Sequence, residues 1–367
     1  MKVVHFGKYY PPYRGGMENF LESLCQGLAR AGVQCEVIVA GNGEKSSCKE
    51  ERGVLVRRMG SLGTIRSLPI CPEAIGALLG LQADIINLHH PNPLADLSYI
   101  LAKPKGRLVV TYHSDIVGQR CLTYLHAPFL HRVLQRADAI VATSPQYVAS
   151  SEVLRNYHNK IHTIPLGFDA PPFGEIKPLT LNNNKGPKYF FIGRLVPYKG
   201  VSVMVEALKQ VPGHLWIAGT GPLEGKLRRQ VGLSGLNERV EFLGNISERE
   251  KFTRLKACDV FVLPSISRAE AFGVALLEAM AMGKPLVVSD LPTGVSLLVQ
   301  NGVNGHRFPP GDAKALAAIL LRLANNPQDM MSMGRASQRL VQEKYTTNTM
   351  INSYLKLYEG LMHLRDV

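Results

Sequence analysis

The sequence predicts two α/β domains in tandem, each a doubly wound sheet of parallel strands. Its 367 residues exceed what one hydrophobic core usually serves, so two domains are the default expectation. Strand candidates alternate with helix candidates in both halves of the chain. The strand candidates are apolar throughout, which is typical of parallel strands covered by helices on both faces.

The first domain is predicted from a series of short apolar segments that begins at the N-terminus. A strand at 2–7 leads through a turn-rich loop, YYPPYRGG, into a helix from about Met17 to Ala31, whose apolar residues recur three and four positions apart. Gly32 suits the end of this helix. Further strands are predicted at 35–41, 84–90, 107–113, 139–144 and 160–167.

The second domain is predicted after a segment in which the alternation of strands and helices is interrupted. Residues 168–188 hold several prolines and a run of asparagines, which indicates an interdomain linker. Strands are then predicted at 188–194, 214–221, 240–244, 259–265 and 284–290, with helices near 200–209, 223–231 and 347–364. We place the domains at residues 1–170 and 171–346. Their loops are expected around a shared cleft, because doubly wound sheets bind ligands beyond the carboxyl ends of their strands.

The composition restricts the partners and the compartment. A formal net charge of +13 indicates an anionic partner, such as a phosphorylated substrate or a membrane surface. The chain has no arginine-rich tract and no zinc-finger spacing, so we expect no nucleic acid. Its six cysteines form no C-x-x-C pair, which indicates reduced thiols in the cytoplasm. We find no signal peptide and no apolar run of about 18 residues, so we expect a soluble protein that attaches at most peripherally to a membrane.

The segment SRAEAFGVALLEAMAMGKP carries the most chemical information. Glu278 lies in a helix that is apolar on nearly every side, where a carboxylate needs a hydrogen-bonding partner. That partner is either a nearby base such as Lys284 or the vicinal hydroxyls of a ligand such as a ribose. Glu270 lies eight residues earlier, about 12 Å away along a helix, so the two carboxylates cannot share one metal or one proton.

Between the two glutamates, the backbone amides of Phe272, Gly273 and Val274 form a predicted helix N-terminus, which suits a phosphate. The order along the chain is then hydroxyl binder, phosphate cradle and hydroxyl binder. That order matches the layout of a sugar, a diphosphate and a ribose.

Two cations and two glycines lie at further strand ends. Arg194 and Lys199 follow a strand in FIGRLVPYKG and suit a diphosphate leaving group, although a solvated basic loop is the alternative. Gly15 and Gly16 allow a ligand to approach the backbone before a helix begins, or they simply form a turn. His113 ends the strand RLVVTYH and either binds a sugar hydroxyl or the acceptor, or is structural.

The sequence offers no evident metal site. No two aspartates are spaced as D-x-D, and no His/Cys cluster has the spacing of metal ligands. We therefore expect Arg194, Lys199 and helix dipoles to neutralise the diphosphate, without a divalent metal or another cofactor.

These motifs together resemble the retaining glycosyltransferases of family 4 (glycosyltransferase group 1), which have the GT-B fold of two Rossmann-like domains facing across a cleft. The resemblance rests on the segments PPYRGGMENF, VTYHSD, ATSP, IPLGFD, FIGRLVPYKG, IAGTGP, EFLGN, NGVNGHRFPPGD and the stretch from Glu270 to Glu278. In such proteins the N-terminal domain binds the acceptor and the C-terminal domain binds the nucleotide sugar. The last helix, at 347–367, would pack back on the N-terminal domain.

The resemblance also implies a role for each site residue. The donor sugar would be held by Glu270 with the amides of Phe272 and Gly273, and the ribose by Glu278. The diphosphate would meet Arg194, Lys199 and the amide of Gly16. His113 matches a cleft histidine of the family, and Ile246 matches a position whose backbone meets the base.

The donor and acceptor are predicted from three stretches, YYPPYRGG, HHPNPLA and YHSDIV. They resemble most closely those of bacterial mannosyltransferases that use GDP-mannose to extend polyprenyl-diphosphate-linked oligosaccharides in polysaccharide synthesis. A UDP-sugar donor, glucosyl or N-acetylglucosaminyl, stays open, as does a non-catalytic nucleotide-sugar-binding relative. The segment LHAPFLHRVLQRA, with His126, His131, Arg132 and Arg136, either lies on an anionic membrane surface or only covers the sheet.

Overall fold

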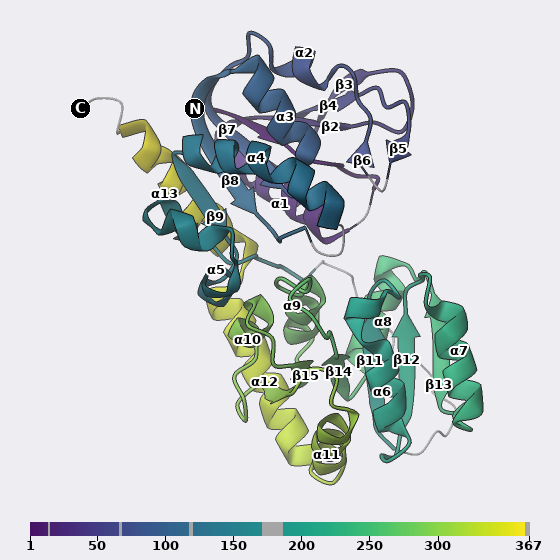
Figure 1. Ribbon diagram of the computed structural model, residues 1–367. Coiled ribbons are helices and arrows are strands. Elements are labelled where there is room, and N and C mark those ends of the chain that lie inside the picture. The colour runs from purple at the N-terminus through teal and green to yellow at the C-terminus, as the bar shows by residue number, and fades with distance from the viewer. Residues whose placement is uncertain (14, 66–67, 117–119, 171–185, 364–367) are drawn as a thin grey trace. The chain divides into compact units, whose positions relative to one another are not determined.

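The computed structural model of the chain describes residues 1–13, 15–65, 68–116, 120–170 and 186–363. The chain forms two compact units, one of residues 1–166 with 347–367 and one of residues 167–346 (Figure 1). The boundary predicted between residues 170 and 171 stays a prediction, because most of the expected linker lies outside the described residues. The expected cleft between the two domains also stays a prediction.

The first unit is built on an eight-stranded sheet in which only β3 runs antiparallel to its neighbour. Its strands, in spatial order, are β10 (Ile161–Thr163), β9 (Ala139–Ala142), β8 (Lys105–Tyr112), β7 (Gln82–His90), β1 (Lys2–Phe6), β2 (Gln34–Ala40), β4 (Val54–Met59) and β3 (Ser47–Glu51). A separate hairpin joins β5 (Thr64–Ile65) to β6 (Leu68–Pro69). The central strands are buried almost completely, which is why they read as unbroken apolar runs.

Helices of the first unit flank this sheet (Figure 1). They are α1 (Gly16–Arg30), α2 (Ala74–Leu78), α3 (Pro93–Ala102), α4 (Arg120–Arg136), α5 (Pro145–Ser150), the 3₁₀ helix η1 (Leu154–Lys160) and α13 (Thr347–His363). The predicted apolar stripe of α1 is buried at Phe20, Leu21, Leu24 and Leu28. Ala31 lies beyond the last residue of this helix and is exposed.

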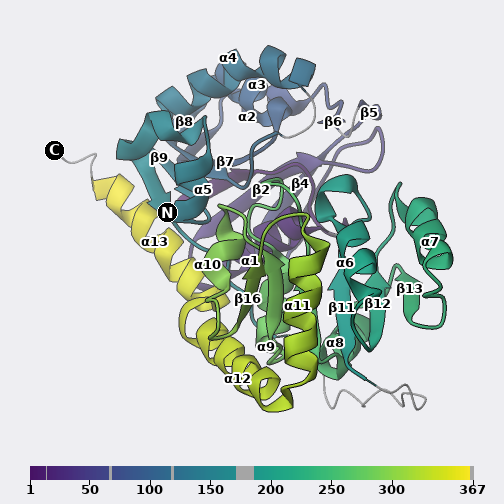
Figure 2. The same cartoon turned by 60° about the horizontal axis from the view of Figure 1, so that its bottom comes forward.

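The second unit is a six-stranded, wholly parallel sheet. Its spatial order is β13 (Val240–Gly244), β12 (His214–Ala218), β11 (Lys188–Ile192), β14 (Val260–Leu263), β15 (Leu286–Ser289) and β16 (Gly305–Phe308). Its helices are η2 (Pro197–Lys199), α6 (Val201–Leu208), α7 (Glu224–Leu233), α8 (Glu248–Ala257), α9 (Val274–Ala281), α10 (Gly294–Leu298), α11 (Ala313–Ala324) and α12 (Pro327–Lys344). Figure 2 shows α7 beside β13, and α11 and α12 at the other end of the unit. Parallel strands with helices on both faces confirm the predicted α/β class.

The C-terminal helix α13 packs against α1 and supplies polar contacts to the first sheet. The side-chain amide of Asn87 donates to the Tyr358 hydroxyl at 2.8 Å, and the Thr111 hydroxyl donates to the Asn87 carbonyl oxygen at 2.9 Å. The hydroxyls of Thr111 and Tyr354 lie 3.2 Å apart. All four side chains are buried, so these contacts satisfy polar groups that water cannot reach. Helix α13 thereby contributes to the core of the unit that contains the first residues of the chain.

We expect Tyr358→Phe to lower the free energy of unfolding of the first unit by about 1–3 kcal/mol, because it leaves the buried Asn87 amide without an acceptor. Native-state hydrogen exchange of the α1 and α13 amides under increasing urea measures this change. Tyr124→Phe is the matched control, since Tyr124 is 79% exposed. A Tyr358→Phe variant as stable as the control would show that this contact does not hold α13.

Candidate functional site

The predicted site residues of the second unit lie at the reversal point of its strand order. The chain passes from β11 to β12 and β13 on one side, and continues with β14, β15 and β16 on the other. The carboxyl ends of β11 and β14 therefore flank the position at which doubly wound sheets bind ligands. The loops after these two strands carry Arg194, Lys199 and Glu270.

These two loops touch through their backbones. The amide of Ile266 donates to the carbonyl oxygen of Tyr198 at 2.7 Å. Gly200 has a left-handed backbone with φ of 64°, and a Cβ at this position would lie 1.9 Å from the carbonyl oxygen of Pro264. Only glycine allows this approach, which brings the end of η2 to the loop that carries Glu270.

Lys199 and Glu270 form an ion pair that is largely buried. Lys199 Nζ lies 2.6 Å from Glu270 Oε2, and the Ser265 hydroxyl donates to the same oxygen at 2.8 Å. Burial alone would lower the pKa of Lys199, but the charges of Glu270 and Tyr198 and the hydrogen bond to Glu270 raise it above its usual value. Lys199 is therefore positively charged at neutral pH. No described residue donates to the other oxygen of Glu270, Oε1, which leaves it available to a ligand hydroxyl.

Arg194 lies directly after β11 and its side chain is exposed. Within the described part of the chain, the Arg194 guanidinium makes no hydrogen bond and no ion pair. An arginine without a carboxylate partner at this strand end is free to contact an anion with its planar fork of donors.

The N-terminus of α9 supplies the predicted amides. Gly273 precedes this helix with φ of 81°, and Val274 is its first residue. The amides of Phe272, Gly273 and Val274 donate to no group in the described ranges, as is usual for the first turn of a helix. Phe272 is 4% exposed, and its side chain packs close to Gly294. The structure therefore presents three free N–H groups immediately after Glu270 in the chain.

Glu278 lies in the second turn of α9 and is paired with a lysine of α8. Lys251 Nζ lies 2.6 Å from Glu278 Oε1 and 2.9 Å from Glu248 Oε2. Burial alone would lower the pKa of Lys251, but the two carboxylates raise it above its usual value. Among the described residues none donates to Glu278 Oε2, so the ion pair leaves one carboxylate oxygen for a ligand.

The alternative partner considered for Glu278, Lys284, is wrong. Lys284 lies beyond the end of α9, and its ammonium donates to the carbonyl oxygens of Lys256 and Cys258, each at 2.8 Å. These carbonyls belong to the C-terminal end of α8, where a cation is favourable. A lysine does pair with Glu278, but it comes from a neighbouring helix rather than from the same segment of sequence.

Ile246 lies in the loop between β13 and α8, and it is half-buried. β13 is the edge strand next to β12, so Ile246 follows the carboxyl end of a strand two places from β11. The same loop leads into α8, which carries Lys251. Helix α8 therefore follows Ile246 in the chain and carries the lysine that contacts Glu278.

In the first unit, Gly15 and Gly16 begin α1 after the loop that follows β1. Gly15 precedes the helix in an extended conformation, with φ of −177° and ψ of 171°, and Gly16 is its first residue. Their amides donate to no described group. The predicted helix N-terminus is therefore present, whereas its ligand stays a prediction.

His113 follows β8, and two further histidines lie in line with it. In the parallel register His5 of β1 is opposite Asn87 of β7, and His89 of β7 is opposite Thr111 of β8. His5, His89 and His113 therefore point to the same face of the sheet. His5 Nδ1 lies 3.1 Å from His89 Nε2, and His89 Nδ1 lies 3.2 Å from His113 Nε2. We call these three residues the histidine column.

The histidine column is neutral near pH 7. Burial lowers the pKa of His5 and of His113 to about 3, and it lowers the pKa of His89 well below 6.5. Each neutral ring has one N–H, and each nitrogen–nitrogen contact needs one. All three rings must then hold the proton on Nδ1, or all three on Nε2. The tautomer of His113 is thus coupled to that of His5, whose Nε2 is buried without a partner.

The segment predicted to lie on a membrane belongs to α4. Tyr124, Leu125 and Phe129 are 79%, 73% and 41% exposed, and Arg132 and Arg136 are exposed as well. His126, however, does not face solvent. It is 6% exposed, and its Nε2 lies 2.8 Å from the buried carboxylate of Asp96 on α3.

Four residues beside the predicted site were missed from the sequence. They are His5, His89, Lys251 and Ser265. Lys251 and His89 contact the predicted residues Glu278 and His113 from other elements, and His5 contacts His89 from a third strand, so spacing along the chain gave no signal for these three. Ser265 contacts Glu270 from within the same loop. Over the described ranges, no group of three or more His, Cys, Asp or Glu residues is arranged to hold a metal ion.

Comparison with known proteins identifies the family. The profile described as Glycosyltransferase Family 4 matches residues 14–170, and the profile described as Glycosyl transferases group 1 matches residues 173–340. The O-antigen chain mannosyltransferase C of Escherichia coli is 35% identical over 374 residues, which cover 100% of both chains. The D-rhamnosyltransferase WbpZ of Pseudomonas aeruginosa is 33% identical, over 94% of this chain and 92% of that protein.

A solved structure supports the fold independently. The sucrose-phosphate synthase of Thermosynechococcus elongatus superposes with a TM-score of 0.83 at 22% identity, and the match covers 99% of each chain. Two doubly wound units with a C-terminal helix returning to the first unit agree with that architecture. The chain therefore belongs to the family 4 glycosyltransferases (glycosyltransferase group 1), which have the GT-B fold.

Proposed function

We propose that the protein transfers mannose from GDP-mannose, with retention of the anomeric configuration, to a glycan or polyprenyl-diphosphate-linked oligosaccharide. The pathway would be the synthesis of a bacterial cell-surface polysaccharide. One observation carries the proposal: a charged lysine, a carboxylate and three free amides gather around the strand-order reversal of the second unit. The choice of mannose is supported by the 35% identical relative, which is named as an O-antigen chain mannosyltransferase.

The parts of the donor would bind in the same order as the residues that contact them, from the loop before α9 into that helix. Glu270 Oε1 accepts a hydrogen bond from a sugar hydroxyl, and the amides of Phe272 and Gly273 donate hydrogen bonds to sugar oxygens. The Val274 amide lies next to them at the helix N-terminus, where an anion is favourable. Glu278 Oε2 accepts from the ribose hydroxyls, and the backbone at Ile246 meets the base.

The leaving diphosphate would be stabilised by Arg194 and Lys199, with the Gly15 and Gly16 amides as further donors. The bond from the anomeric carbon to the diphosphate oxygen breaks while the acceptor oxygen forms a bond on the same side. The proton of the acceptor hydroxyl passes to the departing phosphate, so no separate base is required. In this proposal charge on the diphosphate is met by protein cations and helix N-termini rather than by a divalent metal.

His113 would contact the sugar or the acceptor as a neutral ring. Burial holds the pKa of His113 at about 3, so the ring offers one donor or one acceptor and no charge. Which of the two it offers depends on the tautomer that His5 and His89 share with it.

The name of a second relative supports another candidate for the donor sugar, a rhamnose. The 33% identical protein is named as a D-rhamnosyltransferase, so a GDP-linked 6-deoxyhexose is the candidate that ranks next to GDP-mannose. UDP-linked glucose or N-acetylglucosamine are further outcomes that the donor screen separates. A binding protein without transferase activity would bind a donor in that screen but show no sugar transfer.

We also propose that the protein works in the cytoplasm and attaches peripherally to the inner face of the membrane through α4. Within the described ranges, no helix is long and apolar enough to cross a membrane. The exposed apolar side chains of Tyr124, Leu125 and Phe129, followed by Arg132 and Arg136, suit an anionic lipid surface. Such attachment would bring the enzyme to a lipid-linked acceptor.

A calorimetric screen of GDP-mannose, UDP-glucose, UDP-N-acetylglucosamine and ADP-glucose, without added metal, tests the donor. We expect selective binding of GDP-mannose, and we expect Glu278→Gln to weaken it by about tenfold or more because a ribose contact is lost. Glu248→Gln is the matched control, since Glu248 also pairs with Lys251 but lies outside the proposed ribose contact. If Glu278→Gln and Glu248→Gln weaken GDP-mannose binding equally, Glu278 acts only by holding Lys251 and does not contact the ribose. Selective binding of a UDP-sugar would overturn the GDP-mannose proposal.

Lys199→Ala is expected to lower kcat by about 10²–10³, because charge on the diphosphate grows as its bond to the sugar breaks. Steady-state sugar transfer measures this, with Lys209→Ala as control, since Lys209 forms only a surface pair with Glu206. Ser265→Ala removes one hydrogen bond of Glu270 and keeps the charge of Lys199. If Ser265→Ala costs as much kcat as Lys199→Ala, the lysine acts by supporting Glu270 and not on the leaving group.

The histidine column predicts how stability depends on pH. In the folded state the pKa values lie at about 3 for His5 and His113, whereas an unfolded histidine titrates near 6.5. Below pH 6.5 the unfolded state binds more protons, so the free energy of unfolding falls as pH decreases, by up to about 1.4 kcal/mol per pH unit for each buried histidine. Urea unfolding between pH 7.5 and 5 measures the slope.

Removing one member of the column should make this slope shallower. We expect His5→Leu to reduce it by up to about 1.4 kcal/mol per pH unit, whatever its effect on stability at pH 7.5. His162→Gln, at an exposed position of β10, is expected to leave it unchanged. The same slope in all three proteins would contradict a neutral buried column.

A further inference from the structure

A pocket of about 660 Å³ lies at the amino-terminal edge of the first sheet, the edge opposite to His113. It is formed where α3 ends before β8 and where α4 ends before β9. Its lining residue nearest to His113 along β8, Arg107, is six residues from that histidine, or about 20 Å along the extended strand. It therefore belongs neither to the candidate site of the first unit nor to the donor residues of the second unit.

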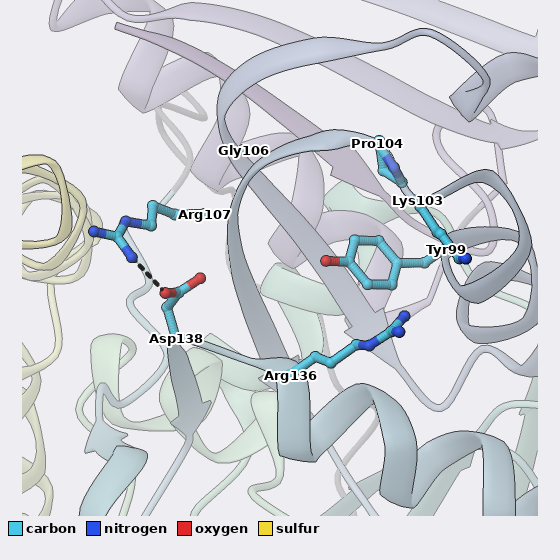
Figure 3. A pocket seen from close by; sticks show the side chains of 7 residues that line it. All are labelled: Tyr99, Lys103, Pro104, Gly106, Arg107, Arg136 and Asp138. Carbon is cyan, nitrogen blue, oxygen red and sulfur yellow. Dashed lines mark hydrogen bonds and ion pairs between the residues drawn. The ribbon is translucent and has the colours of Figure 1, made fainter. Parts of the chain in front are cut away.

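Two cations of this pocket have no partner in the described chain. Lys103 and Arg136 are exposed and make no described hydrogen bond or ion pair with their side chains. The third cation, Arg107, is paired with Asp138 at 2.9 Å, and the other oxygen of Asp138 accepts from the Leu108 amide at 2.7 Å. Figure 3 shows the Arg107–Asp138 pair on one side and the Lys103 and Arg136 side chains beside the Tyr99 ring. The pocket thus has two positive charges that no carboxylate neutralises.

The backbone at Lys103 is unusual for a lysine. Lys103 follows the last residue of α3 with φ of 48° and ψ of 54°, a left-handed conformation in which glycine is the common residue. A side chain there costs roughly 1 kcal/mol relative to glycine. This conformation ends α3, since the Lys103 amide donates to the Tyr99 carbonyl oxygen at 3.0 Å and Pro104 follows.

The remaining walls of the pocket are formed by the backbone at Gly106 and by the Tyr99 side chain. A Cβ on Gly106 would lie 2.5 Å from the Ala83 carbonyl oxygen, so the wall there is bare backbone. The Tyr99 side chain is largely buried, and the charge of Arg136 opposes the rise that burial causes in the pKa of its hydroxyl. Both residues line the pocket, and the Arg136 side chain lies beside the Tyr99 ring (Figure 3).

We propose that this pocket binds a phosphate group, with Arg136 as a fork of donors, Lys103 as a point charge and the Tyr99 hydroxyl as a further donor. Two unpaired cations match the charge of a phosphate monoester, and arginine with lysine is the usual pair for such an anion. The phosphate comes either from a soluble phosphorylated molecule or from a phospholipid headgroup. Residues 125, 129, 132 and 136 of α4 form one exposed stripe that leads from apolar side chains into the pocket.

Site-resolved lysine acylation, read by mass spectrometry, tests the proposal without relying on sugar transfer. Inorganic phosphate replaces chloride at constant ionic strength, and the modification of Lys103 is compared with that of Lys105, an exposed lysine of β8 that does not line the pocket. We expect labelling of Lys103 to fall about tenfold at ten times the dissociation constant, while that of Lys105 stays unchanged. Arg136→Gln should abolish the protection.

A second experiment replaces inorganic phosphate by vesicles of phosphatidylglycerol or phosphatidylcholine and again measures acylation of Lys103 against Lys105. The Lys103→Gly variant is tested by its co-sedimentation with the same vesicles. Glycine suits the left-handed backbone, so this variant should keep its stability and lose pocket-dependent binding. Protection by inorganic phosphate that survives Leu125→Asp supports a soluble ligand. Protection by phosphatidylglycerol vesicles alone, lost in both Leu125→Asp and Arg136→Gln, supports a lipid headgroup. No protection in either experiment, equal protection of Lys105, or protection that persists in Arg136→Gln would overturn the proposal.

Discussion

The contact between the loops after β11 and β14 is the constraint on which the donor half of the site depends. Gly200 packs against the Pro264 carbonyl oxygen, and Ile266 donates to Tyr198, so the two loops form one rigid element. The ion pair of Lys199 and Glu270 sits on this element and needs it. Separating a buried pair leaves an uncompensated charge, which costs about 3–5 kcal/mol. The backbone contact therefore fixes the position of Lys199 relative to Glu270, and moving the two loops apart would separate the ion pair.

The glutamates of the second unit and the histidine column of the first unit are buried among different partners. In the second unit, Glu270 and Glu278 each have a lysine ammonium at 2.6 Å. In the first unit the histidine column has no carboxylate among its described hydrogen-bonding partners, and burial removes the charge instead. The difference suits the proposed chemistry. Anionic phosphates need fixed cations, whereas a neutral sugar hydroxyl needs only a donor or an acceptor.

The sequence was sufficient for the features that arise from local pattern. The apolar strands, the stripe of α1 and the paired glutamates are each visible within about twenty residues, and the structure contains the predicted strands and helices. The edge strand β3 and its neighbour β4 were not predicted, because charged residues interrupt the apolar pattern in both SCKEE and VLVRRM. β16 was also missed, since GHRF has too few apolar residues to be recognised.

The residues that sequence reasoning missed share a different property. Lys251 meets Glu278 because α8 packs beside α9, and His5 meets His89 because β1 lies between β2 and β7. Both contacts are set by strand order and helix packing, which no local pattern encodes. Lys284, the alternative partner considered for Glu278, was suggested only by its nearness along the chain. Its actual acceptors, the last carbonyls of α8, also become visible only in three dimensions.

The pairing of Lys199 has a consequence for how the diphosphate would be met. Glu270 holds the ammonium in place and keeps it charged before any ligand arrives, so no reorganisation is needed when charge develops on the leaving group. Arg194 has no such support among the described residues, and its exposed side chain must lose rotamer freedom on binding, at a cost of up to about 2 kcal/mol. The two cations are therefore unequal. Lys199 is suited to the transition state, where preorganisation acts, and Arg194 to capture of the nucleotide sugar, where a bidentate contact can offset the cost of ordering.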